Sequence, residues 1–273
     1  MKQKVVLITG AGGGIGRVTA LHFAKLGWKV AATVRSSSDG DDMRGIDNIH
    51  VYPLDVTSAE SAASAFESVI RDLGTIDVVV NNAGYGLSGV FEAISDESLR
   101  RQFETNVLGL MRITRLAIEH MRPKRNGVII QISSMGGRIT FPLYAPYHAT
   151  KWAVEGFTES LHYELEQFNI RLKLIEPGLI KTNFAGSSLE MVMPTHTTDY
   201  DEYVRKFTAA SDAALKDAVS PQFVAEAVFT AATDGSAKLR YPAGKPAPMI
   251  LRLRQLISDS MFFRLINRTY GMS

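Results

Sequence analysis

Short apolar runs alternate with longer segments of helical periodicity along most of the chain, and this alternation restricts the fold more than any other feature. The runs are rich in β-branched residues and lack polar alternation, which is typical of strands buried on both faces. We predict seven strands, the last weaker than the others, at residues 4–9, 29–34, 49–54, 76–80, 127–132, 171–175 and 239–241. Strands that alternate with helices predict an α/β fold with a parallel sheet.

Apolar residues recur three and four positions apart in the segments between these strands. This period predicts helices at residues 15–26, 59–73, 97–121 and 146–168, the third of them interrupted near Asn106. The 273 residues contain 45% apolar side chains and no linker, so we expect a single domain over residues 1–273.

Composition excludes several classes of function. The formal net charge is +2 and the charges are interspersed, so there is no basic stripe and we expect no binding of nucleic acid. The chain has no cysteine, which removes disulfides, thiolate metal sites and thiol nucleophiles and is compatible with a reducing cytoplasm. We expect no metal site. Neither a signal-peptide core nor a membrane-spanning stretch is visible, and we expect a cytoplasmic protein without an integral membrane segment.

Two segments of the second half are less regular. Residues 186–220 have no clear period, and a helix begins near Pro221. We predict a substrate loop or lid over residues 185–220, with a tolerated surface insertion as the alternative.

Residues 248–268 mix apolar side chains with arginines and predict an amphipathic C-terminal helix. Its apolar residues do not form one clean face, so we prefer packing on the chain's own fold or a neighbouring subunit to contact with a membrane surface.

Glycines cluster where the first predicted strand meets the first helix, in Thr9-Gly10-Ala11-Gly12-Gly13-Gly14-Ile15-Gly16. A phosphate at such a place meets free backbone N–H groups and the positive end of the helix dipole, and glycine lets the backbone come close. The spacing differs from the GxGxxG fingerprint because residue 15 is Ile. The strand before the cluster and the helix after it nevertheless predict a dinucleotide site.

Tyr147 and Lys151 lie four residues apart in a predicted helix that Pro146 opens, so their side chains share one face. A phenol titrates near pH ~10, and a nearby ammonium lowers that pKa, so the pair can exchange a proton with an alcohol oxygen. Tyr241 and Lys245 have the same spacing, but the proline and glycine between them oppose a helix, and we predict a strand end and a turn there.

The chain carries an ordered set of motifs: Thr9-Gly-x-x-x-Gly14-x-Gly16, Asn81-Asn82-Ala83-Gly84, Asn106, Ser134, Tyr147-x-x-x-Lys151 and Pro177-Gly178. From Lys4 to about Thr182, this set resembles the short-chain dehydrogenase/reductase family. The glycines also fit a spacing of its epimerase and dehydratase branch, but the interval of 13 residues from Ser134 to Tyr147 and the modest length are similar to the compact branch. Residues 30–35 and 134–151 are similar to hydroxysteroid and retinol dehydrogenases. The resemblance implies a Rossmann-type, doubly wound parallel sheet with helices on both faces, and a homodimer or homotetramer.

The resemblance also implies the catalytic roles. Tyr147 would act as acid and base, and Lys151 would lower its pKa and hold the nicotinamide ribose. Ser134 would bind the substrate oxygen, whereas we expect its neighbour Ser133 to be structural. Asn106 would anchor a water that links Lys151 to solvent. Reduction of a carbonyl needs the protonated phenol and oxidation of an alcohol needs the phenolate, so we expect reduction to improve as the pH falls.

The cofactor is predicted from the end of the second strand. Arg35 follows that strand and no carboxylate occupies its tip, which favours NADP over NAD. Asp39 is the nearest acid, and NAD remains the alternative if its loop curls back. The resemblance implies the following cofactor-binding residues: Thr9, Gly10, Gly14, Ile15, Gly16, Arg35, Asp55, Val56, Asn82, Ala83, Gly84, Tyr147, Lys151, Pro177, Gly178 and Thr182.

Apolar residues gather around the catalytic segments and the irregular loop, and they predict a bulky apolar carbonyl or alcohol as substrate. Those that we expect in the substrate wall are Leu87, Phe91, Phe141, Leu143, Tyr144, Phe184, Met191 and Met193. The alternative function is an NADP-binding sensor without turnover. The joint presence of Asn106, Ser134, Tyr147 and Lys151 opposes it, because a sensor needs no catalytic set.

Overall fold

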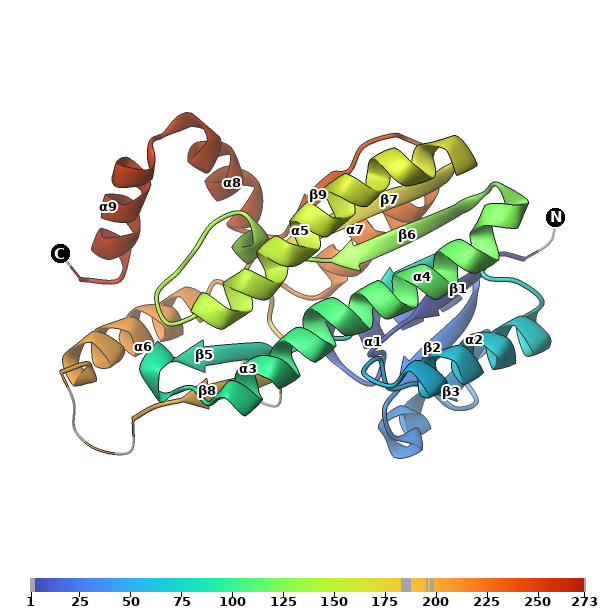
Figure 1. The fold of residues 1–273 in the computed structure, drawn as a ribbon, viewed down its shortest axis with the longest axis horizontal. Helices are drawn as coiled ribbons and strands as arrows, with labels where there is room; N and C mark the ends of the chain where they lie inside the picture. The colour runs from blue at the N-terminus through green and yellow to red at the C-terminus, as the bar shows by residue number, and fades with distance from the viewer. Residues whose placement is uncertain (1–2, 183–187, 195, 197–198, 273) are drawn as a thin grey trace.

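A seven-stranded parallel sheet forms the centre of the protein in this computed structural model, which describes residues 3–182, 188–194, 196 and 199–272 (Figure 1). The sheet has the order β3-β2-β1-β4-β6-β7-β9. Its strands are β1 (Val5–Ile8), β2 (Lys29–Val34), β3 (Ile49–Pro53), β4 (Val78–Asn81), β6 (Gly127–Ile132), β7 (Ile170–Pro177) and β9 (Arg240–Ala243). All seven predicted strands are confirmed, and so is the doubly wound Rossmann-type fold.

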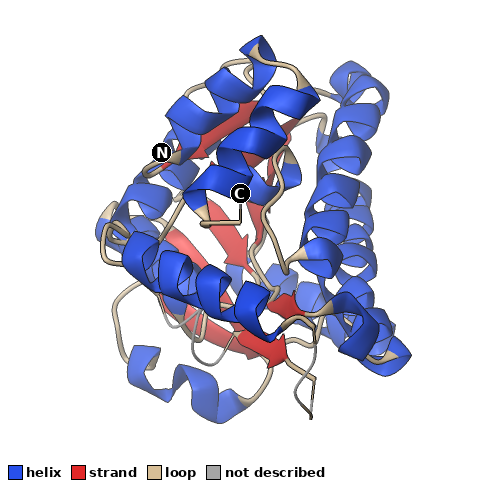
Figure 2. Ribbon diagram, turned by 90° about the vertical axis from the view of Figure 1, so that its left-hand side faces the viewer, coloured by secondary structure: helices blue, strands red, loops and turns tan. Residues whose placement is uncertain are grey.

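Helices cover both faces of this sheet (Figures 1 and 2). On one face α1 (Gly14–Lys25) and α7 (Gln222–Thr233) pack on side chains such as Val6 and Ile8 of β1. On the other face α2 (Ala59–Leu73), α4 (Leu110–Met121) and the end of α5 (Ala145–Leu165) pack on the alternate residues, Val5 and Leu7. Apolar side chains on both faces explain the continuous apolar runs in the sequence.

The predicted helix over residues 97–121 is interrupted at the expected place. It consists of α3 (Asp96–Phe103), a π-helical turn η3 (Glu104–Gly109) that contains Asn106, and α4. Five short 3₁₀ turns join other elements: η1 (Ser37–Met43), η2 (Phe91–Ala93), η4 (Arg122–Lys124), η5 (Met135–Gly137) and η6 (Glu166–Phe168). π-Turns inside helices often occur at functional sites, because they turn one side chain out of the regular helical row.

The order of the strands reverses between β1 and β4, since β2 and β3 lie on one side of β1 and the later strands lie on the other. In such sheets ligands bind outside the carboxyl ends of the strands, at this reversal. The glycine-rich turn follows β1, the Asn82 loop follows β4, Ser134 follows β6 and Pro177 ends β7. The fold therefore brings all the predicted motifs to one edge of the sheet.

The prediction of an irregular segment over residues 186–220 is wrong for much of its length. Strand β8 (Leu189–Val192) pairs in parallel with β5 (Gly86–Gly89), and α6 (Asp201–Leu215) follows it. The pairing brings the backbones so close that a Cβ on Gly89, whose φ is +149°, would lie 1.9 Å from the carbonyl oxygen of Val192. The sequence did not indicate this pairing, because β5 is rich in glycine and its partner lies about 100 residues away.

The C-terminal segment forms two helices, α8 (Ala247–Leu256) and α9 (Asp259–Thr269), and not the single helix that was predicted. Ile257 between them is extended, with φ −119° and ψ 152°. Leu251, Phe262 and Ile266 are buried against Met135 and Ile139, so part of this segment packs on the chain's own fold. In the part of the chain that the structure describes, no helix is long and apolar enough to span a membrane.

Candidate active site

The glycine-rich turn ends at the N-terminus of α1. No side chain caps this helix at Gly13, and its first turn contains no acidic residue. Gly10 and Gly14 have positive φ angles of 66° and 53°, a conformation that favours glycine. Uncapped N–H groups at a helix start suit the phosphates of a nucleotide, so this turn fits the cofactor that the sequence predicted.

The Asn82 loop after β4 packs directly beneath this turn. The Asn82 Nδ2 donates to the carbonyl oxygens of Thr9 (2.9 Å) and Gly10 (3.0 Å), and the Thr9 Oγ1 accepts from the N–H groups of Asn82 (2.9 Å) and Ala83 (3.0 Å). A Cβ on Gly16 would lie 2.4 Å from the Asn82 Nδ2. The structure thus brings these five predicted residues together, and Gly16 is required by close packing.

Three further predicted cofactor residues lie around the turn. Thr182 faces Gly14, since its Cβ lies 3.8 Å from the position of a Cβ there. Ile15 is partly buried against the core, and Gly84 lies beside Asn106, whose Oδ1 would be 3.0 Å from a Cβ on Gly84. The elements that carry these residues are far apart in the sequence but meet at the carboxyl edge of the sheet.

Arg35 and Asp39 differ in how they approach the turn. Arg35 is exposed directly after β2. The loop of Asp39 does curl back, because the Asp39 Cβ and carbonyl oxygen each lie 3.1 Å from the position of a Cβ on Gly12. Its carboxylate accepts from the Ser36 N–H (3.4 Å) and so caps η1. The geometry therefore keeps a carboxylate near the turn, as the NAD alternative requires.

Four predicted cofactor positions are occupied by contacts within the fold. The Asp55 Oδ1 accepts from the N–H (2.9 Å) and the hydroxyl (2.7 Å) of Thr57, and Val56 is buried. A Cβ on Gly178 would lie 2.5 Å from the carbonyl oxygen of Lys245, and Pro177 is the last residue of β7. Packing alone accounts for these residue types, so their contact with a cofactor stays a prediction.

Ser134 and Tyr147 meet at the end of β6. Ser134 caps η5, and its Oγ accepts from the N–H of Gly136 (3.0 Å). The same hydroxyl is hydrogen-bonded to the phenol of Tyr147, in the first turn of α5, and this bond lowers the pKa of Tyr147. Ser133 is buried and its N–H donates to the carbonyl oxygen of Ile175 (2.8 Å). Of the two serines, Ser134 is the one that reaches the tyrosine.

Burial has the largest effect on the electrostatics of Tyr147 and Lys151. Burial raises the pKa of Tyr147 to about 12, and the bond from Ser134 offsets only part of this effect. The Lys151 Nζ donates to the carbonyl oxygen of Ile132 (2.8 Å) and lies 5.8 Å from the centre of the Tyr147 ring. Burial lowers the pKa of Lys151 to about 8. Desolvation is the largest influence on the Tyr147 pKa and keeps the phenol protonated at neutral pH, and the lowering of this pKa by Lys151 stays a prediction.

Asn106 joins the loop after β4 to the start of α5. Its Nδ2 donates to the carbonyl oxygen of Tyr85 (2.8 Å) and to the Thr150 Oγ1 (3.2 Å), and its Oδ1 accepts from the Tyr85 N–H (3.0 Å). The Thr150 hydroxyl in turn donates to the carbonyl oxygen of Tyr147 (2.8 Å). Asn106 thus holds the tyrosine-bearing turn in place, and its role as a water anchor stays a prediction.

A buried charge cluster next to Lys151 was missed in the sequence. Glu155, one turn after Lys151, accepts from the Arg240 Nε (3.0 Å), and the fully buried Glu176 lies 3.6 Å from the guanidinium groups of Arg138 and Arg240. Burial, and secondly the charge of Glu155, raises the pKa of Glu176 to about 7. A glutamate inside the apolar strand β7 was the signal that could have revealed this cluster.

Aromatic side chains extend from Tyr147 toward the C-terminus. Tyr144 lies 6.0 Å from Tyr147 and 6.0 Å from Phe207 of α6, and Phe207 stacks on Tyr270 at 5.2 Å between ring centres. Phe207 and Tyr270 were not predicted, because α6 was not foreseen and Tyr270 lies more than 100 residues from Tyr147.

The predicted wall residues divide into three groups. Leu87 is buried on β5, and Phe141, Leu143 and Tyr144 belong to the loop before α5, with Met193 partly buried. Phe91 and Met191 are exposed, at 61% and 48%. Phe184 lies outside the described residues. Exposure of this extent argues against a place in an enclosed wall for Phe91 and Met191.

A family model described as short chain dehydrogenase matches residues 4–192, which include the glycine-rich turn and the four predicted catalytic residues. The chain belongs to the short-chain dehydrogenase/reductase family. The model covers well over half of the chain, so the membership does not depend on a single motif. In the described ranges of this family member, no three acidic or histidine side chains are grouped to hold a metal ion.

Known members of the family are similar over most of the chain. The uncharacterized oxidoreductase YusZ of Bacillus subtilis is 34% identical over 278 residues, which cover 98% of this chain and 99% of YusZ. Human retinol dehydrogenase 8 is 36% identical over 198 residues, or 69% of this chain and 63% of its own. The structure of ElxO with NADP bound has a TM-score of 0.74 and 28% identity, and the match covers 88% of this chain and 97% of ElxO. The chain is accordingly an oxidoreductase of the short-chain type.

Proposed function

We propose that this protein is an NADP(H)-dependent oxidoreductase that interconverts a carbonyl and an alcohol on an apolar substrate. The observation that carries the proposal is the hydrogen bond between the hydroxyls of Ser134 and Tyr147, at the edge of the sheet where the glycine-rich turn also lies. Two hydroxyl groups that converge on one point can both donate to a substrate oxygen. This arrangement suits a reaction in which that oxygen gains charge.

The chemistry of the chain's own residues follows from their protonation. A bound nicotinamide supplies the hydride. Tyr147, whose pKa is raised to about 12, holds its proton at neutral pH and donates it to the oxygen of the reduced carbonyl. Ser134 stabilises the same oxygen as its charge develops. Lys151, with a pKa of about 8, carries a charge close to the phenol from which the proton departs, and Asn106 holds the turn that carries both. These assignments predict that the proton for reduction is present at neutral pH and that reduction weakens as the pH rises toward the pKa of Tyr147.

NADP is the proposed cofactor. The uncapped start of α1 suits the phosphates, and exposed Arg35 at the end of β2 offers a cation for the 2′-phosphate. ElxO, a relative in structure, was solved with NADP bound. NAD is the alternative, since Asp39 approaches Gly12. Competition between NADPH and NADH in binding experiments distinguishes the two.

The substrate class is proposed from the aromatic residues beside the tyrosine. Tyr144, Phe207 and Tyr270 form a row of rings that leads away from Tyr147. Phe207 is buried, but the partly exposed Tyr144 and Tyr270 offer rings on which flat or extended apolar groups pack well. The name of the relative retinol dehydrogenase 8 agrees with an apolar alcohol or carbonyl. We also propose a homodimer or homotetramer, which light scattering on the purified protein tests.

The deciding experiment measures NADPH consumption against a panel of apolar ketones and aldehydes, with Tyr147→Phe assayed beside the wild type. The substitution keeps the ring and removes the proton, so we expect near-complete loss of turnover with NADPH binding retained. Substantial turnover by the variant would refute the role of Tyr147. Binding of NADPH without turnover of any substrate would instead favour the cofactor sensor.

A further inference from the structure

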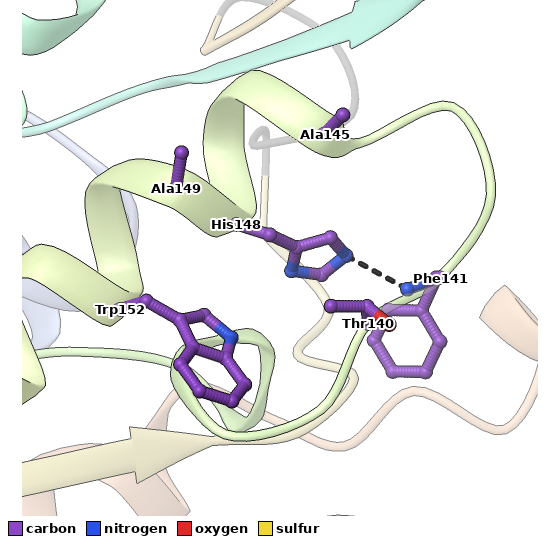
Figure 3. Close-up of a pocket in the computed structure, with 6 residues that line it drawn as sticks. All are labelled: Thr140, Phe141, Ala145, His148, Ala149 and Trp152. Carbon is purple, nitrogen blue, oxygen red and sulfur yellow. Dashed lines mark hydrogen bonds between the residues drawn. The ribbon is translucent and has the colours of Figure 1, made fainter. Parts of the chain in front are cut away.

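His148, the residue after Tyr147, uses both ring nitrogens within the loop that joins Ser134 to α5. Its Nε2 accepts from the N–H of Phe141 (2.9 Å; Figure 3). Its Nδ1 lies 2.8 Å from the carbonyl oxygen of Gly136. A carbonyl oxygen only accepts, so the Nδ1 must carry the hydrogen and the ring is the neutral Nδ1–H tautomer. His148 is therefore a brace between α5 and two points of the loop 136–141.

The brace is connected to the proposed catalytic pair by short steps. Gly136, whose carbonyl His148 holds, donates its own N–H to the Ser134 Oγ (3.0 Å). This contact orients the Ser134 hydroxyl, which is also hydrogen-bonded to the phenol of Tyr147. The packing is tight, since a Cβ on Gly136 would lie 2.8 Å from the His148 Nδ1. Movement of the ring would therefore displace the peptide that orients Ser134.

The surroundings keep this ring neutral. His148 is only 4% exposed, and burial lowers its pKa. The rings of Phe141, Tyr144 and Tyr147 lie 5.4, 6.1 and 6.0 Å from it, and the two tyrosines are its titratable neighbours. On its other side lies an open pocket of about 340 Å³ on the outer face of α5, lined by Thr140, Phe141, Ala145, His148, Ala149 and Trp152 (Figure 3). These pocket residues carry no charge other than that of a protonated histidine.

We propose that His148 is a positioning residue of the reaction: through Gly136 and Phe141 it fixes the loop that aims Ser134 at Tyr147, and it does so only as the neutral imidazole. A protonated ring would turn a second N–H toward the N–H of Phe141, which leaves that donor without an acceptor and repels it. The inference rests on the proposed carbonyl reduction, whose geometry it completes.

The test compares His148→Ala and His148→Gln with the wild type, and uses His162→Ala as the matched control on the same helix. We expect His148→Ala to lower kcat for carbonyl reduction by roughly 10- to 100-fold with little change in NADPH affinity, because small misplacement of a reacting group has effects of this size. Glutamine can accept from the Phe141 N–H and donate to Gly136, so His148→Gln should recover most of the loss. Wild-type kcat in His148→Ala would overturn the proposal.

The pH profile separates positioning from simple packing. Because burial lowers the pKa of His148 below the ordinary histidine value of 6.5, the wild type should lose kcat only at a more acid pH, where this ring becomes protonated. His148→Gln does not titrate there, so the acid limb should disappear while His162→Ala keeps it. An identical acid limb in His148→Gln would assign that limb to another group and overturn the requirement for the neutral ring.

Amide hydrogen exchange tests the brace without any assay of turnover. The N–H of Phe141 should exchange faster in His148→Ala than in the wild type or His162→Ala. Unchanged exchange overturns the brace, and faster exchange with wild-type kcat overturns its role in positioning. If the wild type turns over no substrate, the proposed function fails, while faster exchange still supports the brace itself.

Discussion

Glu176 should make the protein less stable as the pH rises through the range from 4.5 to about 7, because its folded pKa is raised. Below pH 4.5 the carboxyl is protonated in both states. Between these two pKa values the carboxyl loses its proton in the unfolded chain and keeps it in the folded chain. The free energy of unfolding therefore decreases as the pH rises through this range. Since a tenfold change in proton affinity corresponds to about 1.4 kcal/mol, the total loss is roughly 3 kcal/mol.

Glu176→Gln imitates the protonated carboxyl at every pH and removes this loss. We therefore expect the difference in unfolding free energy, variant minus wild type, to increase by roughly 3 kcal/mol between pH 4.5 and about pH 8. Urea unfolding followed by circular dichroism at several pH values measures it. The control is Glu159→Gln. The hydrogen bond from Arg240 lowers the pKa of Glu159, so the Glu159 carboxylate stabilises the folded wild type at high pH. For this variant, the difference in unfolding free energy, variant minus wild type, should therefore decrease as the pH rises. A difference for Glu176→Gln that does not change with pH would refute the reasoning.

Four further substitutions test the cofactor preference and the packing of the fold. Arg35→Glu should raise the Kd of NADPH at least about tenfold, because a hydrogen bond to a charged group contributes about 1.5–3 kcal/mol, and should leave the Kd of NADH nearly unchanged. Equal effects on the two Kd values would oppose the preference for NADP. Phe262→Ala should cost about 3–5 kcal/mol in urea unfolding, since Phe262 is 1% exposed, whereas Phe263→Ala, at 54% exposure, should cost less than about 1 kcal/mol. Gly89→Ala should lower the free energy of unfolding by roughly 2 kcal/mol or more and separate β5 from β8. A variant as stable as the wild type would contradict the close approach of Gly89 to Val192.

Local periodicity was sufficient for the elements of the main sheet. The strands β1 to β4, β6 and β7 were predicted because each contains a short apolar run that ends at a proline or a polar residue, and β9 was the weaker prediction. The interruption at Asn106 and the turn after Tyr241 were predicted for the same local reason. In contrast, β5 and β8 have no strand pattern of their own, and each becomes a strand only because the other lies beside it.

The candidate site shows the same division. The glycine-rich turn, Asn82, Ser134, Tyr147 and Lys151 have characteristic spacings, and the fold brings them to one edge of the sheet. The direction of the Lys151 ammonium, however, depends on the carbonyl of Ile132, which lies on another element. Desolvation and hydrogen bonds depend on such distant neighbours, and spacing along the chain does not contain them.

By itself, then, the sequence determined the parallel sheet, the family and the residues that meet at its carboxyl edge, because strand and helix periods and motif spacings are properties of neighbouring residues. Tertiary structure alone decided which of those residues are charged, paired or constrained. It buried Glu176 beside Glu155, raised the pKa of Tyr147, and placed His148 between Gly136 and Phe141. Burial and pairing arise only when segments from distant parts of the chain pack together, and these contacts set the chemistry of the site.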